Sequence, residues 1–437
     1  MAVPVKQTEV PEQRPPASRL RSRMRKYGTV LGPPVFAVIL AMFAGAIVIL
    51  ITWPNKQVDP FTNIFNAYSA LFTGSYGSLT NISNTLVRVS PLIFASISVA
   101  IAFRAGLFNI GAAGQLAVGA MAADIVGLTF TSWPSWILVP TMLLASILAG
   151  AIWGGIAGFL KAWRGAHEVV TTIMLNWIAF YLTDYLINSA PFTAPFGVTQ
   201  TIALSPQAQL PSLAALYNQT LGNFLPRLDP FLLFSYTVDV SIFFALIALV
   251  IYWFIISRTT FGYELRVIGQ NPKAATYAGI PTKRNIFLVM AIAGAFAGLA
   301  GSTNLMGQPG YELSATAFSV NPTGFDAIAV ALLGQTTAIG ILLASLLIGG
   351  LRSGSTAMQA IAHVDPNIVL IIEALVLFFI AAEFIPVLRR ALPGWLRPRF
   401  RPTLQTTLID STVVDLPEKS NGDAQEGVEV SDLEKEE

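Results

Sequence analysis

The sequence of 437 residues contains no cysteine, two histidines and 11% charged residues. The absence of cysteine excludes disulfide bridges, thiolate metal sites and thiol catalysis. Two histidines, His167 and His363, leave little for a histidine metal site. Soluble globular proteins carry about 25% charged residues, so the low content excludes an ordinary soluble enzyme, a disordered chain and a nucleic-acid-binding protein.

Long apolar runs are what the sequence does contain. Hydrophobic residues make up 54% of the chain, and its mean hydropathy is +0.63. A run of about 20 apolar residues is long enough to cross a bilayer as a helix. We therefore expect an all-α polytopic membrane protein. Eight runs predict spans, at 33–53, 85–103, 106–128, 135–160, 168–187, 231–256, 285–305 and 367–388.

A ninth apolar region, 325–351, is interrupted by Gly334-Gln335-Thr336-Thr337, and each half is too short for an upright crossing. Five basic residues lie in 257–284 and five more between 389 and 401. The positive-inside rule places both segments in the cytoplasm, so the ninth region begins and ends outside. It is either a re-entrant pair of half-helices or two short crossings, which gives eight to ten spans. We expect the interruption to face a cavity within the bundle, since such backbone must be covered by protein or water.

Charge also predicts how the chain is divided. The first 30 residues hold seven basic and two acidic residues and form a cytoplasmic segment. Residues 31–390 form the transmembrane domain, with an outer loop at 188–230 and a cytoplasmic loop at 257–284. Residues 391–437 form a cytoplasmic tail. From Asp410 this tail holds ten acidic and two basic residues, so we expect it to be disordered.

The segment 106–120 places amides and four glycines, at positions 106, 111, 114 and 119, in an apolar stretch. One interpretation is a tightly packed interface in which Asn109 and Gln115 bond to backbone groups. The other is a broken helix that lines a central substrate pathway. Asn176 lies about two turns into the span at 168–187, where we expect it to reach the same pathway.

The loop 261–280 carries a helix start at Asn271-Pro272 and a helix stop at Gly279. A helix of about two turns is marginal alone and needs a surface to pack on. It packs either on its own spans or into a partner protein to which it transmits motion. The coupling candidates in this loop are Arg266, Asn271, Pro272, Lys273, Ala275 and Gly279.

Ionisable residues at membrane depth are costly and are functional candidates by default. Asp124 and Asp184 lie near span ends, where we expect them to be solvated. Asp326 opens the interrupted region and Glu373 lies within the last span. We expect these two to contact the substrate or to form an internal pair with Arg88.

Four of these segments resemble the motifs of permease subunits in bacterial ABC importers for nucleosides and related simple sugars, the branched-chain amino acid/ribose-type family. They begin at Gly106, Glu168, Phe261 and Gly324. The likeness runs from about 84 to 388 in the right order. Ala113 departs from the family pattern, which usually has glutamate there. The Asn-Ile-Gly form of the first motif resembles the nucleoside branch.

The resemblance implies an ATP-driven importer in a prokaryotic cell membrane, with helices surrounding a central pathway. Cytoplasmic ATPase subunits would hold ATP and Mg²⁺, a second permease subunit, like or unlike, would complete the pathway, and an extracytoplasmic binding lipoprotein would deliver the solute. The chain has no P-loop of its own, so we expect no catalytic residue and no cofactor. Two rival interpretations are an ion-coupled secondary transporter and a membrane scaffold.

Overall fold

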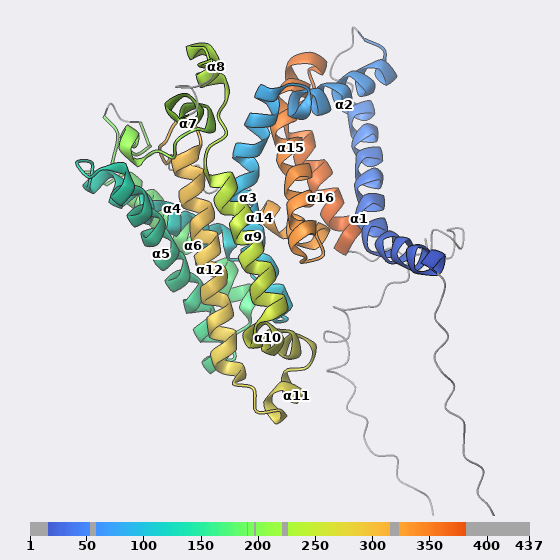
Figure 1. The fold of residues 1–437 in the computed structure, drawn as a ribbon, viewed down its shortest axis with the longest axis vertical. Helices are drawn as coiled ribbons and strands as arrows, with labels where there is room; N and C mark the ends of the chain where they lie inside the picture. The colour runs from blue at the N-terminus through green and yellow to red at the C-terminus, as the bar shows by residue number, and fades with distance from the viewer. Residues whose placement is uncertain are drawn as a thin grey trace, which may run out of the picture. The chain divides into compact units, whose positions relative to one another are not determined.

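The computed structural model describes residues 16–52, 58–189, 191–195, 198–220, 226–314 and 323–381. Within these ranges the chain is helical, and its β pairing is limited to isolated bridges. The elements are α1 (Pro16–Thr52), α2 (Pro60–Tyr76), α3 (Leu79–Arg104), α4 (Ala112–Thr129), α5 (Ser135–Arg164), α6 (Glu168–Ile187), η1 (Pro206–Ala208), α7 (Leu213–Thr220), α8 (Pro230–Ser235), α9 (Ser241–Arg258), α10 (Thr260–Gln270), α11 (Pro272–Tyr277), α12 (Thr282–Gly307), α14 (Thr323–Leu333), α15 (Ala338–Ala362) and α16 (Asn367–Ala381) (Figure 1).

Within the described residues, eight helices are long and apolar enough to cross a membrane. They are α1, α3, α4, α5, α6, α9, α12 and α15, and the apolar part of α1 begins at Pro34. The predicted all-α polytopic class is therefore confirmed. The span predicted at 231–256 begins later, at Ser241, because residues 230–235 form the separate helix α8.

The interrupted region differs from both predicted forms. α14 is a half-helix of 11 residues, whereas α15 continues for 25 residues, well past the predicted end at 351. Between them Gln335 and Thr336 have positive φ angles of 49° and 50°. The Thr336 carbonyl oxygen accepts hydrogen bonds from Arg104 Nη2 at 2.9 Å and Tyr252 Oη at 2.6 Å. Protein side chains thus satisfy the Thr336 carbonyl, whereas the neighbouring Thr337 is exposed. That the interruption faces a cavity stays a prediction.

The helix α2 was not predicted at all, because its 17 residues include too many polar side chains to form a long apolar run. The Asp59 carboxylate caps its start by accepting from the backbone nitrogens of Phe61 and Thr62. Ser75 Oγ donates to the Gly350 carbonyl oxygen of α15 at 2.5 Å, and Tyr68 Oη donates to the Met42 carbonyl oxygen of α1. α2 therefore joins α1 to α15.

Glycines allow α5 and α12 to approach closely. A Cβ atom on Gly294 would collide with the Gly150 carbonyl oxygen, and one on Gly298 would collide with the Ser146 carbonyl oxygen. Small residues at such crossings let membrane helices pack backbone to backbone. This contact fixes α12 against α5 along most of its length.

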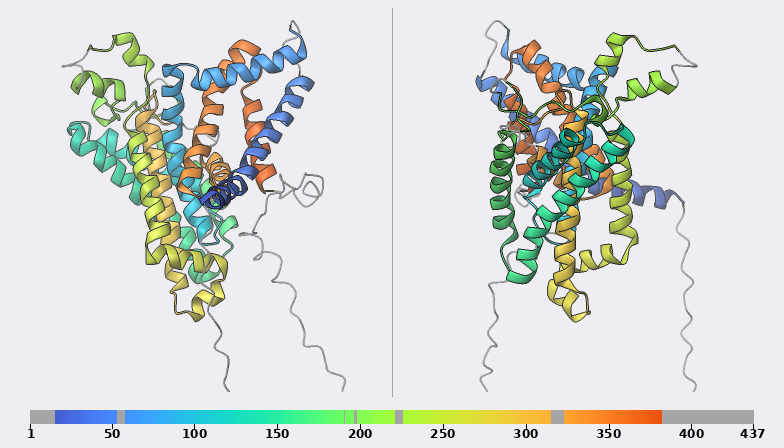
Figure 2. Two further views of the ribbon diagram at one scale, coloured as in Figure 1. Left: turned by 45° about the vertical axis from the view of Figure 1, so that its right-hand side comes forward. Right: turned by 90° about the vertical axis from the view of Figure 1, so that its left-hand side faces the viewer.

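Two groups of connecting segments lie at opposite ends of the helices, as Figures 1 and 2 show. At one end, the loop from 191 to 212 pairs with the segment after α12: the Thr201 nitrogen donates to the Leu313 carbonyl oxygen at 2.8 Å. At the other end lie α10 and α11, which belong to the loop predicted to be cytoplasmic. The predicted basic segment 1–30 is described only from Pro16, and the tail 391–437 lies outside the described residues.

Candidate substrate pathway and coupling surface

Asn109, Gln115 and Asn176 come together in one amide cluster, the name used below for these three residues. Asn109 Nδ2 donates to Gln115 Oε1 at 3.1 Å, and Gln115 Nε2 donates back to Asn109 Oδ1 at 3.2 Å. Asn176 Oδ1 accepts from the Gly114 nitrogen at 2.8 Å, and its Nδ2 donates to the Ile110 carbonyl oxygen at 3.0 Å. The cluster binds α6 to the first turn of α4.

The three amides are at most 3% exposed, and their hydrogen bonds are made within the chain. The non-helical segment between α3 and α4 leaves backbone groups unpaired, and the amides satisfy them: the Gly111 nitrogen donates to Asn109 Oδ1 at 3.1 Å. These contacts agree with the packed-interface interpretation, in which the amides hold together the non-helical segment between α3 and α4. A part of the same amides in a substrate pathway stays a prediction.

Two close backbone contacts join this break to other parts of the molecule. Gly106, with φ +71°, lies against Gly269 of α10: a Cβ atom on Gly106 would be 3.1 Å from the Gly269 Cα atom. On the other side, Ala113 touches Gly324 in the first turn of α14 so closely that a Cβ atom on Gly324 would collide with it. Position 113, where this chain has alanine and the family usually has glutamate, thus lies where a long side chain would push α14 away.

The coupling loop forms two helices, α10 and α11. Asn271 Oδ1 caps α11 by accepting from the Ala274 nitrogen at 3.0 Å, and Gly279 follows its end with φ +78°. Pro272 and Lys273 are exposed, and Tyr277 is 92% exposed. The surface of α11 is therefore available for docking.

Two coupling candidates act within the chain. Ala275 is completely buried, so its side chain packs on this chain's own helices and is not on the docking surface. Arg266 donates to the Ile256 carbonyl oxygen in the last turn of α9. Asn285 Nδ2, on α12, donates to Glu264 Oε2 of α10 at 2.6 Å. These contacts hold α10 and α11 in place but leave α11's outer face uncovered.

Asp326 and Glu373 meet at a residue that the sequence analysis missed, Arg352. Its Nη2 lies 2.9 Å from both oxygens of Asp326 and 2.8 Å from Glu373 Oε2. The expected internal pairing exists, but its cation is Arg352 on α15 and not Arg88. The side chains of Arg352, Asp326 and Glu373 are 21%, 13% and 6% exposed. We refer to these three residues as the ion-pair cluster; it ties α14, α15 and α16 together.

Two further acidic residues, Asp124 and Glu168, lie apart from this cluster. Asp124 is fully buried on α4, so the prediction that it is solvated is wrong. Glu168, at the start of α6, forms an ion pair with Lys161 of α5, with 2.7 Å between Nζ and Oε2. This pair closes the turn between the two helices.

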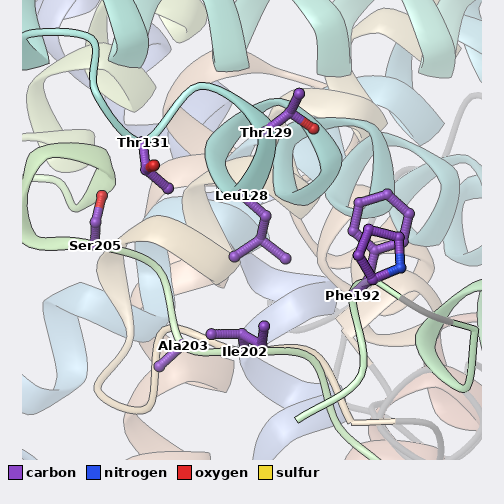
Figure 3. Close-up of a pocket in the computed structure, with 8 residues that line it drawn as sticks. Leu128, Thr129, Thr131, Phe192, Ile202, Ala203 and Ser205 are labelled. Carbon is purple, nitrogen blue, oxygen red and sulfur yellow. The ribbon is translucent and has the colours of Figure 1, made fainter.

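A pocket of about 330 Å³ lies between the last turn of α4 and the loop that follows α6. Figure 3 shows Leu128 of α4 extending toward the loop residue Ile202. Thr129 of α4 and Ala203 of the loop also line the pocket. Its other lining residues are Thr131, Pro191, Phe192 and Ser205. The lining carries no charge and belongs to the loop end of the molecule, away from the ion-pair cluster at the middle of α15.

Long membrane-crossing helices, a half-helix, and a buried ion-pair cluster at mid-depth are together features of a membrane transport subunit. The chain belongs to the family described as branched-chain amino acid transport system / permease component, whose model matches residues 81–381. The family membership that the motifs implied is thereby confirmed. The protein is a multi-pass protein of the cell membrane.

The chain is similar to three transporter permeases over most of their length. It is 38% identical to the guanosine ABC transporter permease protein NupP of Bacillus subtilis, over 80% of this chain and 93% of that one. It is 35% identical to the nucleoside permease protein NupB of Lactococcus lactis, with 80% and 91% covered. It is 34% identical to the glucose permease protein TsgB13 of Haloferax volcanii, over 81% of this chain and 88% of that one. No solved structure matches the chain.

Proposed function

We propose that this chain is the permease subunit of an ATP-driven importer and carries nucleosides, or related simple sugars, across the cell membrane. The observation that carries the proposal is the match to NupP, which extends over 93% of that guanosine permease. A cytoplasmic ATPase that holds ATP and Mg²⁺, a second permease and an extracytoplasmic binding lipoprotein would complete the transporter. Because a glucose permease is also similar, at 34% identity, sugars are the second substrate class.

In this proposal, α11 receives the motion of the ATPase through its exposed face, including Lys273 and Tyr277. α10 carries the motion inward, because Gly269 packs against the backbone at Gly106. The break between α3 and α4 then transmits it to α14 through the contact of Ala113 with Gly324. The amide cluster makes this segment rigid enough to move as one body.

An ion-coupled mechanism is the less favoured alternative. Such a transporter needs a carboxylate that releases and rebinds an ion or proton during each cycle. Asp326 and Glu373 both lie within 3 Å of the Arg352 guanidinium, which already balances part of their charge. Their pairing supports a structural role in the moving helices over an ion-binding role.

Uptake by intact cells tests the substrate class. In a strain that lacks its own nucleoside importers, expression of this chain with its partner subunits is expected to confer uptake of radiolabelled guanosine. Excess unlabelled nucleoside should compete with the label and excess glucose should not, because the proposed pathway accepts the base together with the sugar. If glucose competes and nucleosides do not, the chain belongs with the sugar permeases instead.

A further inference from the structure

Arg88 occupies an exceptional position on α3. Of the eight spans, α3 is the most enclosed: 89% of its most apolar window is buried, against 28% for α5. Its residues from Val89 to Phe103 are all buried, whereas Arg88 is exposed. The deepest exposed position on the innermost helix is thus an arginine.

Arg88 also lies well inside the membrane-crossing helix α3. It is the tenth of 26 residues in α3, about 14 Å from the helix start at 1.5 Å per residue. A charged side chain at the centre of a bilayer costs about 3 kcal/mol or more if it faces lipid. Its exposed surface therefore calls for water or a polar partner.

Arg88 completes the charge balance of its surroundings. Arg88 lies close enough to Arg352 for the two positive charges to repel, and Arg352 is held by Asp326 and Glu373. Two acids and two arginines make this region neutral as a whole. Among the described residues, no acidic side chain lies within 4.0 Å of the Arg88 guanidinium.

Other helices surround the helix that carries Arg88. α9, α12, α14 and α15 pack against α3, and Val87 and Val89 on either side of Arg88 are buried, whereas Arg88 itself keeps accessible surface. A charged side chain with accessible surface on so enclosed a helix fits the wall of a water-filled opening better than a surface that faces lipid.

We propose that Arg88 lines the translocation pathway at mid-depth and donates hydrogen bonds to the neutral solute as it passes. The proposal rests on the importer function proposed above. A guanidinium has five N–H donors and suits the oxygen and nitrogen acceptors of a base or the hydroxyl oxygens of a sugar. Because the neighbouring acids already balance the positive charges, the solute needs acceptors but no negative charge.

Because the chain contains no cysteine, thiol labelling of a single-cysteine variant reports only on the introduced position in this chain. In the assembled transporter in membranes, Arg88→Cys is treated with a membrane-impermeant methanethiosulfonate reagent. Two matched variants serve as controls: Val89→Cys, at a fully buried neighbour, and Ile152→Cys, at a 67% exposed apolar position on α5. The reagent attacks the thiolate, which forms poorly in apolar surroundings.

We expect Arg88→Cys to react about tenfold faster or more than both controls, because only its thiol meets water. Saturating guanosine with binding protein should slow the reaction. A rate as low as that of Ile152→Cys would mean that lipid or a partner subunit covers position 88. A rate as low as that of Val89→Cys would mean that it is buried. Either result overturns the proposal.

A second measurement covers the case in which Arg88→Cys fails to assemble. Arg88→Leu is expected to lower the maximal uptake rate about 10- to 100-fold, because the solute loses a hydrogen bond from a charged donor. The solute affinity of the binding protein should not change, and Arg88→Lys should restore much of the rate. Equal uptake by Arg88→Leu and the native chain would refute a solute contact. Failure of ATP-driven uptake in the native transporter would instead refute the importer function, while the labelling pattern would stand.

Discussion

Replacing Arg352 by alanine is expected to destabilise the protein by about 3–5 kcal/mol and to abolish uptake, because removal of one partner leaves Asp326 and Glu373 buried without a counter-charge. Both carboxylates lie within 3 Å of Arg352 Nη2 and are almost enclosed by protein. The loss also releases α14 from α15 and α16. Thermal unfolding of the purified transporter in detergent, together with uptake in cells, measures both effects.

A triple variant separates charge imbalance from lost packing. Arg352→Met combined with Asp326→Asn and Glu373→Gln removes all three charges and keeps similar side-chain volumes. Replacing a whole buried ion pair by neutral groups is often close to neutral in stability. We therefore expect the triple variant to recover most of the stability that Arg352→Ala loses. If Arg352→Ala alone is as stable as the native chain, the ion-pair cluster does not hold the three helices.

Tyr277→Glu is expected to uncouple the transporter while its fold remains intact. Tyr277 is 92% exposed on α11, so the substitution disturbs no packing within the chain. Aromatic residues at the centre of an interface commonly contribute 2 kcal/mol or more, so binding of the ATPase should weaken about 30-fold or more. Co-purification of the ATPase with the permease and ATP-driven uptake in cells should both fall.

Two variants serve as comparisons for Tyr277→Glu. Tyr277→Phe keeps the aromatic surface and should retain most of the ATPase binding. Ala275→Glu should instead lower the stability of the permease itself, since Ala275 is fully buried within the chain. Normal ATPase binding by Tyr277→Glu would show that α11 does not dock through this face.

Local signals in the sequence predicted local structure well. Asn271 followed by Pro272 indicated the start of α11, because the cap and the fixed proline dihedral act within one turn. Apolar runs likewise located most spans, and α6 has the predicted bounds of 168–187. The face of α11 that is buried was beyond prediction, since it depends on where α10 and α12 lie.

Contacts between distant helices explain what the sequence did not reveal. Arg352 ended the apolar run at 351, so α15 was predicted too short. A charge is tolerated there only because Asp326 and Glu373 arrive from two other helices. In the same way, the residue types of the amide cluster were recognised from the sequence. Their partners depend on the approach of α6 to α4, which brings Asn176 to the Gly114 nitrogen.

The central claim is that this chain is a passive pathway moved by ATP hydrolysis in a partner subunit. The most direct test reconstitutes it in liposomes with its second permease and ATPase, and adds binding protein with radiolabelled guanosine on the outer-face side. The account predicts accumulation of guanosine against its gradient with Mg-ATP on the ATPase side, and none with an ion gradient alone. Accumulation driven by a proton or sodium gradient in liposomes that lack the ATPase would contradict it.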